Sequence, residues 1–378
     1  MDFTLSEEHK MLQTMVRDFA KEKLEPVADA LDRKQEFAWD NFKLMADIGL
    51  LGIQIPPQYG GSGGDTMSYV VALEELAVAC ASTNDILGTH LGLCTLPIYN
   101  FGNEEQRKKY LPLLCKGEKV GAFALTEAEA GSDVGSMKTT AVKDGDSYIL
   151  NGTKIFMTNG DAAGIGVVFA RIPELGPRGI TAFIVEDTMP GFSKGKKYDK
   201  LGMRGATNCD FIFEDCRVPA ANRLGNEGQG MRICLATLDH GRVGMTAQAC
   251  GITQAILTRT TEYAKTRVQF GVPISQHQSI GFRLADVATE LQASRWLMYH
   301  AASLADSGQR YTKEAAMAKL FSSEMCMRAA TFGIQVFGGY GYMYDLPMQR
   351  YFRDAKLIEI YEGTSEIQRL VISGTLFK

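Results

Sequence analysis

The amino-acid sequence predicts an α+β protein in which a middle β domain separates two helical domains. Hydrophobic positions follow a helical period at both ends of the chain, whereas short β-branched and aromatic runs fill the middle. Because the strands are grouped instead of alternating with helices, a doubly wound parallel sheet is disfavoured. The expected domains are an N-terminal all-α domain over 1–118, an antiparallel β-barrel-like domain over 119–225 and a C-terminal all-α bundle over 226–378.

The N-terminal part is expected to begin with an amphipathic helix after Ser6. Its apolar face, which we expect to pack against the core, consists of Met11, Leu12, Met15, Val16 and Phe19. The glycine-rich stretch 59–65 then interrupts the helical pattern. Since it lacks the Lys-Ser/Thr pair of a phosphate-binding P-loop, we expect a connecting loop there.

The middle region contains runs that are typical of an antiparallel β unit, over 148–150, 153–157, 166–170, 180–185 and 209–213. The pair Asn151-Gly152 predicts a two-residue hairpin turn between the first two runs. A loop over 125–136, rich in small residues and hydroxyls, follows an earlier strand. Such a loop can wrap a polar or anionic cofactor edge, although an ordinary polar turn has the same composition.

The C-terminal part predicts long helices over 279–305 and 313–337. Ser365 and Gln368 match a capping box, so a last helix should begin there and leave Glu362 and Gly363 in the preceding turn. A glutamate followed by glycine suits a mobile general base, and a solvated carboxylate is the alternative. Arg267, in an inter-helix loop, can bind an anion in a bidentate manner or stabilise a helix C-terminus.

Composition excludes several classes of function. A net charge of −4 provides no basic field for nucleic acid. No apolar run is long enough to span a bilayer, and the stretch from Met1 to Glu8 lacks the features of a signal peptide, so a cytoplasmic protein is expected. The eight cysteines form no Cys-x-x-Cys pair, so we expect no metal site and interpret them as small buried residues. The glycines of 338–341 follow a helical segment, which disfavours a Rossmann nicotinamide site.

Five motifs, in this order, resemble the acyl-CoA dehydrogenase family over essentially the whole chain, and most closely its bacterial short-chain, butyryl-CoA-type members. They are Ala124-Leu125-Thr126-Glu127 with Gly131-Ser132-Asp133, Arg267-x-x-Phe270-Gly271, Gln335-x-Phe337-Gly338-Gly339-Tyr340-Gly341, Arg353-Asp354-Ala355-Lys356 and Tyr361-Glu362-Gly363-Thr364. The resemblance implies that family's fold and FAD as cofactor. It also implies α,β-dehydrogenation of a short-chain, branched or alicyclic acyl-CoA, in which Glu362 removes the α-proton and flavin N5 accepts the β-hydride.

Residue roles follow from the same resemblance. The positions that it implies for FAD are Phe123, Leu125, Thr126, Gly131, Ser132, Phe156, Thr158, Arg267, Phe270, His277, Gln278, Gln335, Gly338, Gly339, Thr364 and Glu366. The positions that it implies for the acyl-CoA are Ser132, Asp239, Arg242 and Gly363. The set from Arg267 to Gly339 matches positions that bind the FAD of a neighbouring subunit. A homotetramer is therefore implied, and an electron-transferring flavoprotein is the implied electron acceptor.

Two residues depart from the family pattern. Ala128 stands where the family usually has proline, which should loosen the loop slightly, and Phe156 stands where it often has tryptophan. Two other functions stay open: an acyl-CoA oxidase-like flavoenzyme, and a catalytically silent flavin-binding assembly paralogue. Rapid reoxidation of reduced flavin by air would indicate the oxidase, whereas the Tyr-Glu-Gly-Thr setting of Glu362 counts against the silent paralogue.

Asp85 is a further candidate substrate contact, because the corresponding helix in the family forms the floor of the acyl pocket. One interpretation is that it caps a helix whose first turn is 86–88. The other is that its carboxylate faces the distal acyl carbons. It would then disfavour long alkyl chains, recognise a polar acyl group or act as a second base on a cyclic substrate.

Overall fold

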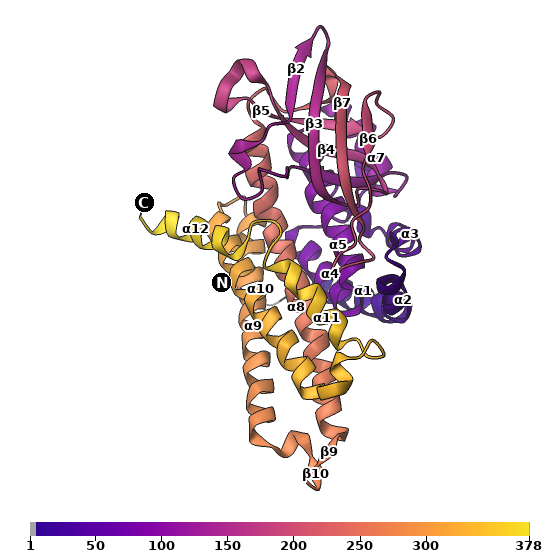
Figure 1. Cartoon of the computed structure of the whole chain (residues 1–378), viewed down its shortest axis with the longest axis vertical. Coiled ribbons are helices and arrows are strands. Elements are labelled where there is room, and N and C mark those ends of the chain that lie inside the picture. Colours follow the sequence, from indigo (N-terminus) through magenta and orange to yellow (C-terminus); the bar gives the residue numbers. More distant parts are fainter. Residues whose placement is uncertain (1–4, 378) are drawn as a thin grey trace.

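The computed structural model describes residues 5–377 and confirms the order of helices, strands and helices (Figure 1). The N-terminal helices are α1 (Glu7–Phe19), α2 (Ala28–Lys34), α3 (Trp39–Asp47), α4 (Thr66–Ala79), α5 (Ala81–Leu87), α6 (Leu96–Phe101) and α7 (Glu104–Cys115). A π-helical segment, Gly88–Thr95, joins α5 to α6. As expected, the stretch 59–65 is a connection, and Asp65 caps α4 by accepting a hydrogen bond from Ser68 N.

The first helix begins after Ser6 as predicted, but only part of its apolar face is buried. Val16 is fully buried and Leu12 and Phe19 pack against the core, whereas Met11 is 72% exposed and Met15 is 41% exposed. The prediction that the whole stripe faces the core is therefore wrong for these two residues. Positions 12, 16 and 19 form one line along the helix, and positions 11 and 15, four residues apart, form a second line beside it.

The middle strands are β1 (Val120–Ala124), β2 (Thr140–Asp144), β3 (Ser147–Thr158), β4 (Ala163–Arg171), β5 (Ile180–Glu186), β6 (Phe192–Lys194), β7 (Asn208–Pro219) and β8 (Arg223–Leu224). They form one sheet in the order β6-β7-β3-β2-β4-β5-β8, with β1 pairing β4. Most pairs are antiparallel as expected. However, β1 pairs with β4 in parallel, and β2 touches β4 in parallel at one position, so the sheet is mixed.

The predicted hairpin turn at Asn151-Gly152 is wrong, because β3 runs straight through that pair. The turn between β2 and β3 lies instead at Gly145, whose φ is 62°. Gly152 marks a shift in the register of β3 against β7, and its φ is 145°. A Cβ at Gly152 would lie 2.5 Å from Thr139 Oγ1, so glycine is required there by a bulge and a close approach.

The C-terminal helices are α8 (Gly230–Thr266), α9 (Gln278–Asp306), α10 (Thr312–Phe337), α11 (Met348–Ile358) and α12 (Ser365–Leu376), and the short strands β9 (Val268–Gln269) and β10 (Val272–Pro273) join α8 to α9. The helices predicted over 279–305 and 313–337 are thus confirmed. Figure 1 shows α8, α9 and α10 running along the long axis, with the sheet at one end and the β9–β10 hairpin at the other.

The cysteines, the possible metal ligands and the helix lengths were considered over the described part of the chain. All eight cysteines are buried free thiols. Within residues 5–377, no cluster of His, Cys, Asp and Glu is arranged to hold a metal ion. Over the same range, every helix is too short or too polar to cross a membrane.

Candidate functional site

The turn between α11 and α12 presents Glu362 from a constrained backbone. Glu362 has a φ of 53° and Gly363 one of 93°, so a non-glycine residue occupies the left-handed region. Lys319 Nζ donates to Gly363 O at 2.6 Å, and Gln368 Nε2 donates to the same oxygen at 2.7 Å. These two side chains, from α10 and α12, hold the turn in its uncommon conformation.

The cap of α12 differs by one residue from the prediction. Thr364, not Ser365, is the N-cap, since its hydroxyl accepts a hydrogen bond from Ile367 N at 3.3 Å. Ser365 is the first helical residue. Glu362 and Gly363 nevertheless lie in the turn before the helix, as predicted.

The carboxylate of Glu362 is buried against α8. Its Oε2 has no hydrogen-bond partner and no contact with solvent, which counts against the alternative of a solvated carboxylate. A Cβ on Gly241 of α8 would overlap this oxygen, so the carboxylate occupies the space that a side chain at 241 would take. Burial raises the pKa of Glu362 to about 8, and the negative charge of Asp85 also raises it. The positive charges of Lys319 and Arg242 lower it.

The predicted substrate contacts Asp239 and Arg242 lie beside this turn on α8. Arg242 Nη1 donates to Asp239 Oδ1 at 2.7 Å, and Thr312 Oγ1 donates to Asp239 Oδ2 at 2.6 Å. Arg242 is buried, and its Nε has no hydrogen-bond partner. A Cβ on Gly363 would lie 3.7 Å from Arg242 Nη2, so the structure brings Asp239, Arg242, Glu362 and Gly363 together.

Asp85 is buried near the same turn. It lies inside α5, which begins after Cys80, so the interpretation that Asp85 caps a helix is wrong. Both carboxylate oxygens lack a hydrogen-bond partner. Burial raises the pKa of Asp85 to about 6, and the charge of Lys200 opposes the shift. The Tyr361 hydroxyl is close enough to affect this pKa, but it donates its proton to Gln248 Oε1.

A second group of predicted residues lies at the base of the sheet. Ile155 N donates to Thr126 O at 2.9 Å, which places Thr126 beside β3. Asn208 Nδ2 donates to Phe156 O at 2.8 Å and to Thr158 Oγ1 at 3.1 Å. Phe156 has a φ of 67°, and its side chain is 55% exposed. An exposed aromatic ring that is held by a backbone of positive φ is suited to pack against a planar ligand.

The loop over 125–136 is held by a buried ion pair that the sequence analysis did not identify. Lys154 Nζ donates to Glu127 Oε1 at 2.7 Å and to Leu125 O at 3.0 Å. Glu127 Oε2 also accepts a hydrogen bond from Lys138 N at 2.6 Å. The pair fixes both ends of the loop. Among the predicted FAD residues of this segment, Phe123 and Leu125 are buried, whereas Gly131 and Ser132 are exposed.

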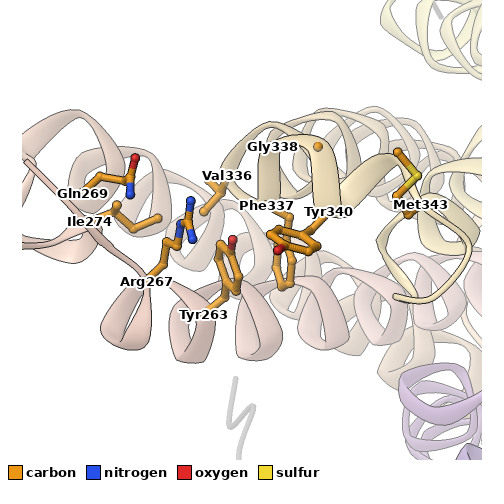
Figure 2. A pocket seen from close by; sticks show the side chains of 10 residues that line it. Tyr263, Arg267, Gln269, Ile274, Val336, Phe337, Gly338, Tyr340 and Met343 are labelled. Carbon is orange, nitrogen blue, oxygen red and sulfur yellow. The ribbon is translucent and has the colours of Figure 1, made fainter.

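A third group lies where α8, α9 and α10 approach the β9–β10 hairpin. A groove of about 420 Å³ is lined by Arg267, Gly338 and Gly339, among others. Figure 2 shows Arg267 beside Tyr263, and the Tyr263 ring stacks on Phe337 with 4.1 Å between centroids. The remaining predicted residues of this group, all on the surrounding loop and helix ends, are Phe270, His277, Gln278 and Gln335.

The third group does not meet the second group within one chain. Figure 1 places the β9–β10 hairpin at the opposite end of the long helices from the sheet, whose strand β3 contains Phe156. Phe270, next to the hairpin, is 96% exposed, which is unusual for an aromatic side chain with no partner surface. Thr364 and Glu366, also predicted to contact FAD, lie instead beside Glu362 at the start of α12.

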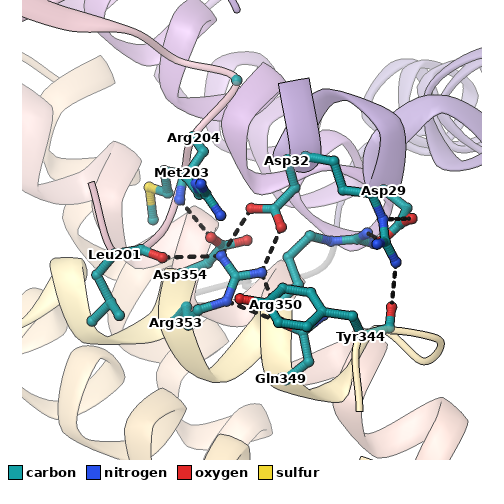
Figure 3. A network of polar contacts seen from close by, with 12 residues as sticks. Asp29, Asp32, Leu201, Met203, Arg204, Tyr344, Gln349, Arg350, Arg353 and Asp354 are labelled. Atoms are coloured by element: carbon teal, nitrogen blue, oxygen red, sulfur yellow. Dashed lines mark hydrogen bonds and ion pairs between the residues drawn. The ribbon is translucent and has the colours of Figure 1, made fainter. Parts of the chain in front are cut away.

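The helix that leads into the Glu362 turn is anchored by a polar network (Figure 3). Arg353 of α11 binds both oxygens of Asp32 on α2, at 2.9 and 2.5 Å, and donates to Leu201 O at 2.9 Å. Its neighbour Asp354 accepts a hydrogen bond from Met203 N at 2.5 Å. In the sequence this segment is recognisable only as a motif. The structure shows that it joins α11 to the N-terminal domain and to the segment before β7.

Family models match nearly the whole chain. They are described as the N-terminal domain of acyl-CoA dehydrogenase, over residues 6–118, its middle domain, over 122–216, and its C-terminal domain, over 228–377.

Individual proteins match over their full length. An acyl-CoA dehydrogenase of Bacillus subtilis is 50% identical over 98% of each chain. The solved structure of butyryl-CoA dehydrogenase from Megasphaera elsdenii is 44% identical, with a TM-score of 0.98 over 100% of both chains. A structure described as electron transferring flavoprotein of Acidaminococcus fermentans contains a chain that is 46% identical, also with a TM-score of 0.98 over 100% of both chains.

Proposed function

Because this chain belongs to the acyl-CoA dehydrogenase family of FAD-dependent oxidoreductases, we propose that it dehydrogenates a short or compact acyl-CoA to the 2-enoyl-CoA. The observation that carries the proposal is the carboxylate of Glu362. Its Oε2 is buried and has no hydrogen-bond partner, and its pKa is raised. These are the properties of a general base that can accept a substrate proton.

The residues around Glu362 support distinct roles in this reaction. Glu362 takes the α-proton from the thioester. Its backbone N–H is our candidate donor to the thioester oxygen, where negative charge develops. Lys319 and Gln368 hold the turn through Gly363 O, and Arg242 and Asp239 offer polar contacts to the acyl-CoA beside it. Bound FAD supplies the acceptor for the β-hydride.

The buried carboxylate disfavours the catalytically silent alternative. An unpartnered buried carboxylate is costly for folding, so its presence is best explained by a chemical task. Under anaerobic conditions, a matching acyl-CoA should bleach the flavin absorbance. Failure of linear, branched and alicyclic short acyl-CoAs to bleach a fully FAD-loaded preparation would contradict dehydrogenation.

The electron acceptor forms part of the same proposal. We propose an electron-transferring flavoprotein, and the likeness to a chain from a structure described by that name supports it. The oxidase-like alternative requires fast reaction of reduced flavin with oxygen. The substrate-reduced protein should therefore be reoxidised slowly in air and rapidly by an electron-transferring flavoprotein.

We propose further that FAD lies between subunits of a homotetramer. The support is the separation of the groups: the Arg267 groove lies by the β9–β10 hairpin, at the other end of the long helices from the sheet whose strand β3 contains Phe156. In this arrangement, Arg267 and Gln335 to Gly339 of one subunit complete the flavin surface that Thr126 and Phe156 provide in another.

Replacing Arg267 with alanine should lower both FAD content and the population of the assembled form. The guanidinium can make two charge-assisted hydrogen bonds to a phosphate, and its loss removes them from the shared site. FAD per chain by absorbance and mass by light scattering would measure the effect. Lys265→Ala, which removes an exposed cation two residues earlier, should change neither quantity. Unchanged FAD content and mass in Arg267→Ala would refute the shared site.

The pocket role of Asp85 is the remaining part of the proposal. Its burial inside α5, near Tyr361 and Glu362, supports a position facing the acyl group. Asp85→Asn keeps the shape and removes the titrating carboxyl, so it should change the ranking of kcat/KM across a panel of apolar, polar and alicyclic acyl-CoAs. Asn84→Ala is the neighbouring control, because Asn84 Nδ2 donates to Leu73 O and should affect stability alone. A ranking unchanged by Asp85→Asn would remove Asp85 from the substrate contacts.

A further inference from the structure

Tyr69, on α4, is a buried aromatic residue to which neither the sequence motifs nor the proposed reaction gives a role. It is fully buried, yet its hydroxyl has no hydrogen-bond partner. The ring stacks on His240 with 4.8 Å between centroids and a 22° angle between planes. His240 is itself fixed by a 3.0 Å hydrogen bond between its Nε2 and Gln54 Oε1. The ring of Tyr69 therefore has little freedom to turn away.

Two glycines from different elements make room for the Tyr69 hydroxyl. A Cβ on Gly244 of α8 would lie 2.8 Å from this oxygen, and a Cβ on Gly92 of the π-helical segment would lie 2.6 Å from it. Both distances are too short for a real contact. The hydroxyl is thus wedged into a gap between α8 and the segment Gly88–Thr95, and this gap exists only because both positions lack a side chain.

The Glu362 carboxylate packs against the same face of α8. Gly241, against which Glu362 Oε2 lies, is three residues before Gly244, so the two glycines are neighbours on one face of the helix. The Tyr69 hydroxyl and the Glu362 carboxylate are therefore about one helical turn apart along α8, or ~5 Å.

A third buried group, Asp85, interacts electrostatically with Tyr69. Burial raises the pKa of Tyr69, and the charges of Glu362 and Asp85 raise it further. Asp85, Tyr69 and Glu362 each have a buried polar atom without a hydrogen-bond partner. Buried polar atoms are normally satisfied, so this group of orphaned atoms marks a space that a ligand or water enters.

We propose that Tyr69 is the end stop of the acyl pocket and a specificity-determining residue for short acyl chains. This inference rests on the proposed function and names the residue that sets its substrate class. An acyl chain that places its α-carbon at Glu362 and continues inward along α8 meets the Tyr69 ring after about one helical turn. The stacked His240 and the glycine gap hold the ring in that position, so a longer chain has no path past it.

The test compares two chain lengths in the FAD-loaded protein. In the unaltered protein, kcat/KM for octanoyl-CoA should be at least tenfold below that for butyryl-CoA. Tyr69→Leu removes the far half of the ring, so it should raise the octanoyl-to-butyryl ratio at least tenfold. Tyr69→Phe keeps the blocking ring and should leave the ratio within threefold. Tyr110→Leu alters another fully buried tyrosine, on α7, and should lower stability without changing the ratio.

An unchanged ratio in folded, FAD-loaded Tyr69→Leu would overturn the inference, and so would equal use of the two substrates by the unaltered protein. The comparison of octanoyl-CoA with butyryl-CoA in the unaltered protein tests the inference even if Tyr69→Leu fails to fold. Failure of every acyl-CoA to bleach the flavin would instead contradict dehydrogenation. Perturbation of the flavin spectrum by bound butyryl-CoA and octanoyl-CoA would then test the length limit by affinity: tighter binding of butyryl-CoA supports the end stop, and equal or tighter binding of octanoyl-CoA overturns it.

Discussion

Glu362→Gln should slow reduction of the bound flavin by an acyl-CoA by ~10³-fold or more, with little change in acyl-CoA affinity. Glutamine keeps the shape of the side chain in the space beside Gly241 but cannot accept the α-proton. Anaerobic stopped-flow absorbance of the flavin measures the rate, and spectral titration measures the affinity. Glu359→Gln makes the same chemical change three residues earlier, where the carboxylate pairs with Lys356, and should leave the rate near normal. Near-normal reduction in Glu362→Gln would show that another residue is the base.

The raised pKa of Glu362 gives this prediction a pH dependence. Only the deprotonated carboxylate accepts a proton, so kcat/KM should increase as pH rises toward the pKa of about 8 and level off above it. Burial also lowers the pKa of Lys319 to about 8, so this neighbour loses its charge over the same range. The pH profile of the residual activity of Glu362→Gln is therefore the control, because this variant keeps Lys319 but lacks the base. The increase in kcat/KM with pH should be absent from that profile. A profile that is flat between pH 6 and 9 in the unaltered protein would contradict the raised pKa.

The fold could be predicted where the sequence pattern is long and periodic. The helices α9 and α10 begin and end within about a residue of the predicted bounds because an apolar period persists for many turns. The pair Asn151-Gly152 failed because glycine in a strand serves a bulge as well as a turn, and only the partner strand β7 decides between them. The parallel pairing of β1 with β4 joins segments that are distant in sequence, so no local pattern indicates it.

The site was predictable only in part, for a related reason. The capping pattern placed Glu362 in a turn before a helix, and the family resemblance gave it a role. Its burial depends on Gly241, and the shape of its turn depends on Lys319, which belong to other helices. Nothing in the sequence around Gly241, Lys319 or Tyr69 marks them, because their roles arise from contacts between elements. Asp85 has a local pattern that fits a cap, but α5 begins earlier, and that pattern was misleading.

Gly241→Ala should abolish most activity without unfolding the protein. The added methyl group would occupy the position of Glu362 Oε2 and lie 3.0 Å from Leu93 Cδ2. The atoms it displaces are the ends of flexible side chains, so the structure can respond by rotating the Glu362 carboxylate away from the α8 face. A base moved by about 1 Å from its reacting position can lose ~10²-fold in rate. Stability should change little, because alanine is favoured over glycine inside a helix by about 1 kcal/mol, which offsets part of the overlap.

Three measurements on Gly241→Ala separate a displaced base from a damaged fold: the flavin reduction rate, the midpoint of thermal unfolding and FAD content. We expect the first to fall ~10²-fold and the other two to stay near those of the unaltered protein. Gly374→Ala, in α12, adds the same methyl group to a helical glycine with nothing within 4 Å, so it should leave the reduction rate unchanged. A Gly241→Ala protein that reduces its flavin at the normal rate would show that the Glu362 carboxylate does not need the space at Gly241. In that case the base must approach the α-carbon from a position away from α8.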